Sequence, residues 1–209
     1  MGEPTPTVCV VDDDPDVLKA IGRLLQSVGF DVATFSSPQQ FLDGWDRSAP
    51  GCLVLDLALP GLTGLELQRV LEQQAILLPI VFLTGRGDIA KSVQAMKLGA
   101  ADFLTKPVDD AELIAAIREA LARDQAQRHA NVEREHVAKC LATLTERERQ
   151  VLEQIVAGRL NKQIAAELGT VEKTIKFHRG NLMRKMGVRV VADLVKLAER
   201  AGVGRTPKT

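Results

Sequence analysis

Two short apolar runs in this chain each end on acidic side chains. The run Thr7–Val11 leads directly into Asp12–Asp14, and the run Cys52–Leu55 leads into Asp56. Strands buried inside parallel sheets have such continuous apolar runs, and the carboxyl ends of neighbouring parallel strands meet at one edge, where open α/β folds hold their sites. We therefore expect the two groups of acids to face one another at the edge of a parallel sheet.

The sequence from residue 7 to about residue 124 alternates short β-rich runs with amphipathic stretches, the pattern of consecutive βα units. Gly29, Gly51, Gly85, Gly87 and Gly99 are expected at the joints between them. This alternation predicts a five-stranded, parallel, doubly wound α/β sheet. The strands are expected at Val8–Val11, Val32–Phe35, Leu53–Asp56, Ile80–Thr84 and Asp102–Thr105, and the helices near Asp16–Val28, Pro38–Trp45, Gly64–Gln74 and Asp88–Leu98 and from Asp110 onward.

The C-terminal part of the chain has helical patterns only. Residues 111–136 contain no Gly or Pro, so the fifth helix is expected to continue beyond the sheet as a rigid linker. Thr145 and Glu148 have the spacing of a capping box, which predicts a helix start. We expect an α/β domain at residues 1–122, a helical linker at 123–140 and a four-helix domain at 141–209. The last four helices are expected at Glu146–Ala157, Asn161–Leu168, Glu172–Met186 and Val190–Ala201.

The two halves of the chain carry opposite charge. Residues 1–124 contain 10 Lys and Arg against 18 Asp and Glu, a net charge of −8, whereas residues 125–209 contain 17 against 9, a net charge of +8. A basic half suits a polyanion such as DNA, and an acidic half suits a cation.

Several features predict a cytoplasmic protein without a membrane partner. No apolar stretch approaches the roughly 18 to 20 residues that span a bilayer, and the N-terminal residues do not resemble a secretory signal. The chain has three cysteines, Cys9, Cys52 and Cys140, an odd number without the spacing of metal ligands. We therefore expect them to be packed free thiols.

Converging carboxylates repel one another unless a cation lies among them, and Mg²⁺ is the simplest cation for such a site. Asp13 and Asp56 are the expected direct ligands, with Asp12 acting through water. Thr84 and Lys106 end the next two predicted strands and lie at the same edge. Together these groups would bind a phosphoryl group, with Asp56 as its nucleophilic acceptor. The Thr84 hydroxyl, a main-chain amide near Gly85 and the Lys106 ammonium would contact the phosphoryl oxygens.

Each of these residues also has an ordinary structural explanation. Asp12–Asp14 would cap the first helix, Asp56 would close a turn, Thr84 would be a strand-end hydroxyl, and Lys106 would be a solvated cation. The recurrence of such residues at four strand ends favours a site.

These residues closely resemble the receiver domain of bacterial response regulators over about residues 7–122. The resemblance implies a flavodoxin-like fold, phosphorylation of Asp56 by a sensor histidine kinase, Mg²⁺ held by Asp12, Asp13, Asp56 and the main-chain carbonyl of Ala58, and reorientation of Thr84 and Phe103. The matching motifs are VVDDD (Val10–Asp14), LDLALPG (Leu55–Gly61), LTG (Leu83–Gly85) and FLTKP (Phe103–Pro107).

Ala58 departs from the family, which has a larger side chain two residues after the phosphoacceptor. Alanine also cannot donate a proton, which argues against the rival interpretation of a Mg²⁺-dependent phosphohydrolase. A second rival, an adaptor with a degenerate and unphosphorylated pocket, is disfavoured because the pocket residues are all present.

Helices separated by Gly158 and Gly169 predict a helix-turn-helix, whose second helix enters the major groove of DNA. Ile175, Leu182 and Met186 recur at helical spacing and should face the core. The cations of the recognition helix are expected at Lys173, Lys176, Arg179, Arg184 and Lys185.

Residues 140–202 resemble the LuxR-type DNA-binding domain through LTERE (Leu144–Glu148), NKQIA (Asn161–Ala165), TIKFH (Thr174–His178) and KMGV (Lys185–Val188). The resemblance implies that Lys176, Phe177 and Gly180 face base edges, and that Thr174, His178, Arg179 and Lys185 lie near the DNA backbone.

Two positions in the recognition helix leave alternatives open. Phe177 would contact a thymine methyl or pack beneath the helix. Val171 stands where the family usually has Ser, so Thr170 or solvent must cap the helix.

With both resemblances, the chain looks like a response regulator of the NarL/FixJ group. We expect a phosphorylation-dependent transcription regulator that forms a homodimer on phosphorylation and binds double-stranded DNA, with RNA polymerase as a further candidate partner.

Overall fold

The computed structural model describes residues 5–85 and 89–203, with the side chains of residues 89–92 left out. The chain divides into two compact units, residues 1–128 and 129–209, and each is described by itself.

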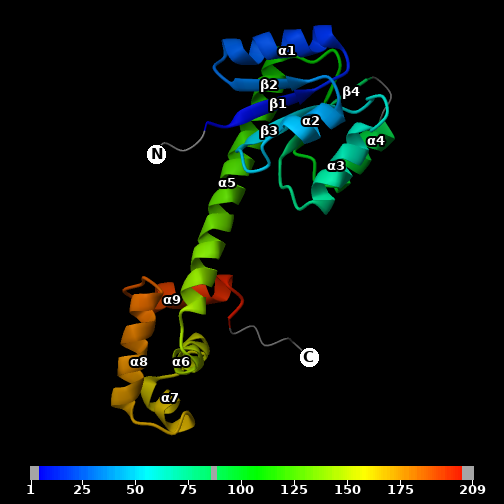
Figure 1. The fold of residues 1–209 in the computed structure, drawn as a ribbon. Coiled ribbons are helices and arrows are strands. Elements are labelled where there is room, and N and C mark those ends of the chain that lie inside the picture. The colour runs from blue at the N-terminus through cyan, green and yellow to red at the C-terminus, as the bar shows by residue number, and fades with distance from the viewer. Residues whose placement is uncertain (1–4, 86–88, 204–209) are drawn as a thin grey trace. The chain divides into compact units, whose positions relative to one another are not determined.

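The N-terminal unit contains a five-stranded parallel sheet with the order β2-β1-β3-β4-β5 (Figure 1). Its central strand, β3, is buried at every residue, as its apolar sequence predicts. The predicted sheet is confirmed, with strand boundaries within two residues of those expected. The strands are β1 (Thr7–Val11), β2 (Asp31–Phe35), β3 (Gly51–Asp56), β4 (Ile80–Thr84) and β5 (Asp102–Thr105).

Helices cover both faces of this sheet (Figure 1). Phe41 of α2, Leu67 of α3 and Ala95 of α4 pack on one face, and Leu25 of α1 and Ile117 of α5 pack on the other. The predicted start of the fourth helix, Asp88, lies outside the described residues. The helices are α1 (Pro15–Ser27), α2 (Pro38–Gly44), α3 (Gly64–Gln73), α4 (Ile89–Lys97) and α5 (Asp110–Ala142).

Gly51 is the first residue of β3, at the joint between the strand and the connection that precedes it. It pairs with Thr7 of β1, and a Cβ atom at this position would lie 2.1 Å from the Thr7 carbonyl oxygen. The close approach of the two backbones therefore requires glycine here.

A partly buried ion pair between Asp124 and Arg128 of α5 attaches this helix to the amino end of β3. Asp124, which is 3% exposed, accepts hydrogen bonds from the Gly51 amide at 3.0 Å and from Arg128 Nε at 2.8 Å. Arg128 also donates to the carbonyls of Ser48 at 2.8 Å and Ala49 at 2.6 Å. These contacts explain why the first unit extends to Arg128.

The helix α5 continues to Ala142, two residues beyond the end of the helical linker expected at residues 123–140. No helix in the described part of the chain, α5 included, is both long and apolar enough to cross a membrane. Cys9 and Cys52 are buried free thiols, as predicted, and burial raises the pKa of Cys9 to about 12.

The C-terminal unit is all-helical in its described residues, which confirms the prediction. The core of this unit includes Ile175, Leu182 and Met186, as their helical spacing predicts. The predicted capping box is also present, with Thr145 and Glu148 as its two members. The helices are α6 (Glu146–Val156), α7 (Asn161–Glu167), α8 (Glu172–Lys185) and α9 (Val191–Arg200).

The N-cap of α8 is Val171, which makes no side-chain capping bond and is 65% exposed. The sequence left Thr170 or solvent as the cap of this helix. Among the described residues no Thr170 side-chain bond to the first turn is present, so solvent is left to satisfy the first amides.

Replacing Val171 by Ser should stabilise the C-terminal unit by about 1 kcal/mol, because a hydroxyl at the N-cap accepts a bond from the first turn of α8. Urea denaturation followed by circular dichroism measures the change. The matched control is Val132→Ser, at an exposed valine inside α5, where no cap can form and Ser and Val have similar helix propensities. An equal shift in both variants would contradict the capping account.

Candidate functional site

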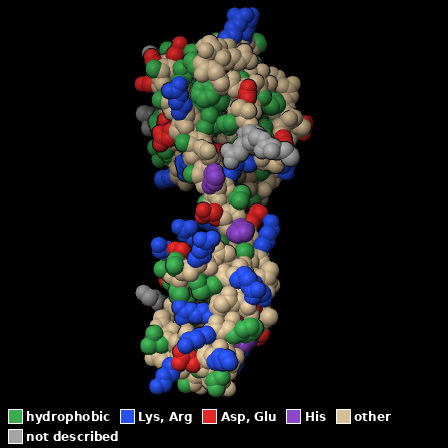
Figure 2. Space-filling view, turned by 90° about the vertical axis from the view of Figure 1, so that its left-hand side faces the viewer, with side chains coloured by type: hydrophobic (Ala, Val, Ile, Leu, Met, Phe, Trp, Pro, Cys, Tyr) green, Lys and Arg blue, Asp and Glu red, His purple; other side chains and the backbone are tan. Residues whose placement is uncertain are grey.

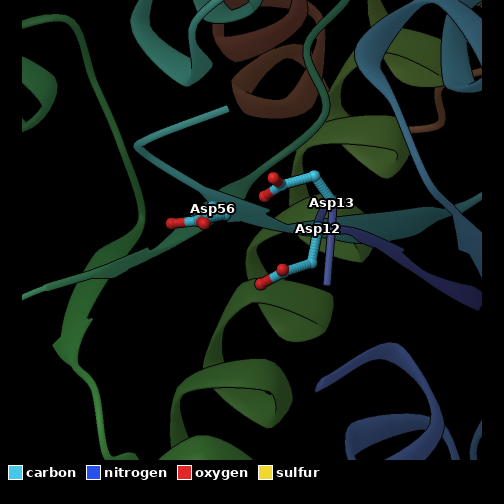
Figure 3. Close-up of side chains that lie close together, drawn as sticks. All are labelled: Asp12, Asp13 and Asp56. Carbon is cyan, nitrogen blue, oxygen red and sulfur yellow. The ribbon is translucent and has the colours of Figure 1, made fainter. Parts of the chain in front are cut away.

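The acidic residues predicted from the two apolar runs meet at the carboxyl edge of the sheet. Val11 of β1 pairs with Leu55 of β3, so Asp12 and Asp56 are the next residues of two neighbouring strands. One carboxylate oxygen from each of Asp12, Asp13 and Asp56 lies within 4.8 Å of the others (Figure 3). Asp12 is 1% exposed and Asp56 is 7% exposed, whereas Asp13 faces solvent.

Asp14 has a different role from its two neighbours. Its side chain is the N-cap of α1 and accepts hydrogen bonds from the amides of Asp16 and Val17. Its own amide donates to Asp12 Oδ1 at 2.9 Å. The capping explanation therefore holds for Asp14, and the cluster explanation holds for Asp12 and Asp13.

Lys106 is the cation of this site. Thr84 and Thr105 pair across β4 and β5, and the Lys106 amide donates to the Thr84 carbonyl at 2.7 Å, which places Lys106 at the same edge. Its Nζ lies 2.6 Å from Asp12 Oδ2 and 3.1 Å from Asp56 Oδ2. The bond between Lys106 and Pro107 is cis.

The charge of Lys106 is stabilised by these carboxylates. Burial lowers its pKa, but the hydrogen bonds and charges of Asp12 and Asp56 outweigh burial, so the pKa lies above its ordinary value. Lys106 is therefore protonated at neutral pH.

Thr84 ends the strand beside Asp56, since Leu83 pairs with Asp56. It is 2% exposed, and its hydroxyl donates to the Gly85 carbonyl at 3.3 Å. The Ala58 amide donates to Asp56 Oδ1 at 3.3 Å. Phe103 lies on β5 and is 39% exposed.

The cluster fits a magnesium ion. In the part of the chain that the structure describes, it offers three carboxylates within 4.8 Å against the one ammonium of Lys106, an excess of negative charge. Carboxylate oxygens are hard ligands of the kind that Mg²⁺ takes.

In the C-terminal unit, several predicted DNA-contacting side chains are exposed. Phe177 is 65% exposed, so it does not pack beneath the helix. Lys176 is exposed and pairs with Glu172 at 3.1 Å, and Gly180 is exposed, whereas Thr174 and His178 are partly buried. Lys and Arg side chains gather on the surface of this unit (Figure 2).

Two other predicted DNA-contacting residues have intramolecular partners that the sequence did not indicate. Arg179 donates to Asn161 Oδ1 of α7 at 2.9 Å. Lys185 donates to Glu148 Oε2 at 2.7 Å and to the Thr143 carbonyl at 2.9 Å. Their contact with the DNA backbone stays a prediction.

Glu148 connects the capping box of α6 to the end of α8. It is 3% exposed, and its carboxylate accepts from the Thr145 amide as well as from Lys185. The hydrogen bond from Lys185 is the main cause of a pKa below the ordinary glutamate value; burial opposes it, and the Thr145 bonds reinforce it.

Comparison with known proteins agrees with both halves of this description. The family model described as "Response regulator receiver domain" matches residues 8–118, and the model described as "Bacterial regulatory proteins, luxR family" matches residues 142–198. The fold and its acidic edge therefore define a receiver domain joined to a helix-turn-helix domain.

Individual relatives match along almost the whole chain. The response regulator protein TodT of Pseudomonas putida is 43% identical, covering 96% of this chain and 88% of the relative. The transcriptional regulatory protein FixJ of Azorhizobium caulinodans is also 43% identical, with 94% and 93% coverage. The solved structure of the response regulator StyR is 44% identical, with a TM-score of 0.84, 94% coverage of this chain and 99% of that chain.

The chain belongs to the two-component response regulators of the NarL/FixJ group. It is a response regulator with a LuxR-type DNA-binding domain, which implies phosphorylation-dependent regulation of transcription.

Asp13→Asn should lower the affinity for Mg²⁺ at least tenfold, because it removes one charged oxygen donor from the cluster. Isothermal titration calorimetry measures the affinity. Asp14→Asn is the matched control, since Asn is an equally good N-cap and Asp14 lies outside the cluster. Equal losses in the two variants would contradict the assignment of Asp13.

Lys185→Met should destabilise the C-terminal unit by about 1–3 kcal/mol, because it leaves a buried carboxylate without its charged partner. Since the pKa of Glu148 is lower in the folded than in the unfolded chain, this contribution is fully present above the ordinary value of 4.5 and is lost as the pH falls through the folded value. Denaturation of wild type and variant at pH 7 and in this acidic range measures it. A difference between them that stays constant or grows on acidification would contradict the ion pair.

Proposed function

We propose that the chain accepts a phosphoryl group on Asp56 from a sensor histidine kinase, with Mg²⁺, and then binds promoter DNA as a homodimer. The observation that carries this proposal is the position of Asp56. Its carboxylate lies in one cluster with Asp12 and Asp13 and 3.1 Å from the Lys106 ammonium, at the edge of a sheet.

In the transfer, a carboxylate oxygen of Asp56 forms a bond to phosphorus as the phosphorus–nitrogen bond to the kinase histidine breaks. Mg²⁺ held by Asp12, Asp13, Asp56 and the main-chain carbonyl of Ala58 would supply neutralisation of the phosphoryl oxygens. Lys106 is already protonated and directed at the acceptor, so it neutralises a further oxygen without moving far.

The Thr84 hydroxyl and the main-chain amide of Gly85 complete the phosphoryl-binding set. When Thr84 turns toward the phosphoryl oxygens it leaves space at the carboxyl end of β4, and Phe103 on the paired strand β5 turns inward to fill it. The face formed by α4 and β5 changes as a result. In the present conformation this face exposes Val93 at 50%, Met96 at 43% and Phe103 at 39%.

Dimerisation through the face of α4 and β5 would pair two DNA-binding domains on a two-fold-related site. The proposed contacts to base edges are Lys176, Phe177 and Gly180, with Thr174, His178, Arg179 and Lys185 toward the backbone. The exposed ring of Phe177 supports contact with a thymine methyl.

The chain acts in the cytoplasm, with RNA polymerase as a further partner, and its chemistry is limited to phosphorylation and autodephosphorylation of Asp56. We assign residues 1–122 to the receiver, 123–140 to the linker and 141–209 to the DNA-binding domain.

Asp56→Asn should abolish phosphate-dependent occupancy of promoters, because an amide oxygen cannot form the acyl phosphate. Genomic footprinting of wild type beside the variant measures occupancy. Asp31→Asn, at an exposed acid of β2, is the matched control and should behave as wild type. Unchanged occupancy in Asp56→Asn would leave DNA binding intact and remove the phosphorylation switch from the proposal.

A further inference from the structure

Gln68 is a buried polar side chain in the interior between α3 and α4. It lies on the inward face of α3 with Leu67 and Leu71, and it is 4% exposed. Its Nε2 donates to the carbonyl of Ala95 at 3.3 Å and to the carbonyl of Leu98 at 3.2 Å. These two carbonyls belong to the C-terminal end of α4.

The C-terminal turn of a helix carries partial negative charge, so its carbonyls attract donors. The Ala95 carbonyl accepts hydrogen bonds from the Leu98 and Ala100 amides, and Gln68 is an additional donor to it. An amide NH₂ group has two donors, and Gln68 directs both at this end of α4. The contact is therefore a side-chain cap supplied by another helix, 27 and 30 residues away in sequence.

The described side chains of α4, from Val93 to Lys97, make little apolar contact with the sheet. Between Val93 and Lys97 only Ala95 is buried, and it contributes a single methyl group. Val93 and Met96, the larger apolar side chains of this stretch, are 50% and 43% exposed. Little apolar area of this described stretch faces the sheet, and the two hydrogen bonds from Gln68 hold the C-terminal end of the helix by direct polar contact.

Gln68 occupies this place at a cost. Its Oε1 is buried and has no hydrogen-bond partner among the described residues. A buried carbonyl without a partner is destabilising, and Leu at this position would extend the apolar face of Leu67 and Leu71 without that penalty. Packing of α3 alone does not account for a glutamine here.

We propose that Gln68 is a positioning residue of the phosphorylation switch. Its amide holds the C-terminal end of α4 in the conformation in which Lys106 pairs with Asp56 and Phe103 is exposed. This inference rests on the proposed function, in which α4 and β5 change on phosphorylation.

A contact made in only one of two conformations biases the equilibrium between them. Loss of the Gln68 cap therefore favours the dimer-forming conformation without a phosphoryl group. A phosphoryl analogue is expected to bind more tightly to the dimer-forming conformation. As long as that conformation is the minor one, its affinity rises by the same factor as the population of that conformation.

The experiment compares full-length wild type, Gln68→Leu and Gln73→Leu. Gln73 is an exposed glutamine on the same helix and serves as the matched control. Sedimentation equilibrium gives the dimer dissociation constant with and without beryllofluoride and Mg²⁺, and calorimetry gives the beryllofluoride affinity. Gln68→Leu should lower the dimer dissociation constant at least threefold without beryllofluoride and tighten beryllofluoride binding at least threefold, whereas Gln73→Leu should match wild type.

A change in thermal stability alone, with both equilibria as in wild type, would show a merely structural role and overturn the proposal. If Gln68→Leu does not fold, Gln68→Met removes the same donors with an unbranched side chain, and the same two outcomes decide. Wild type that fails to dimerise with beryllofluoride would overturn the proposed switch and this inference together. A responsive wild type with an unaltered Gln68→Leu would overturn this inference alone.

Discussion

The site depends on the compensation of crowded negative charge at one edge of a parallel sheet. Carboxylate oxygens of Asp12, Asp13 and Asp56 lie within 4.8 Å of one another, and the Lys106 ammonium contacts two of these residues. The register of four strands fixes this arrangement, because each functional residue ends its strand or follows within two residues of its end. Among the described residues an excess of negative charge remains, which suits the proposed binding of a divalent cation and an electrophilic phosphoryl group.

The C-terminal unit uses charge differently. Lys185 and Arg179 each donate to a neighbouring element within the helix-turn-helix, and Lys185 joins the end of α8 to the buried Glu148. The cations of α8 therefore fall into those that hold the helix in place and those that are exposed, such as Lys176. This division gives the recognition helix a fixed orientation while leaving an exposed basic surface with Phe177 beside it.

The strands and the acidic edge could be predicted from the sequence, because apolar runs identify buried parallel strands and strand ends share one edge. The helix starts at Asp14 and Thr145 followed from local capping chemistry. Contacts between residues far apart in sequence could not be predicted in this way. The partners of Gln68 and Lys185 and the burial of Asp124 depend on how complete helices pack, and no local pattern records that packing.

The most direct test of the central claim is to map the adduct formed with acetyl phosphate. The full-length protein is incubated with acetyl phosphate with and without Mg²⁺, the acyl phosphate is reduced with borohydride, and the modified residue is located by mass spectrometry. The account predicts one modified residue, Asp56, and a yield that depends on Mg²⁺. Modification at another carboxylate, or an equal yield without Mg²⁺, would contradict it.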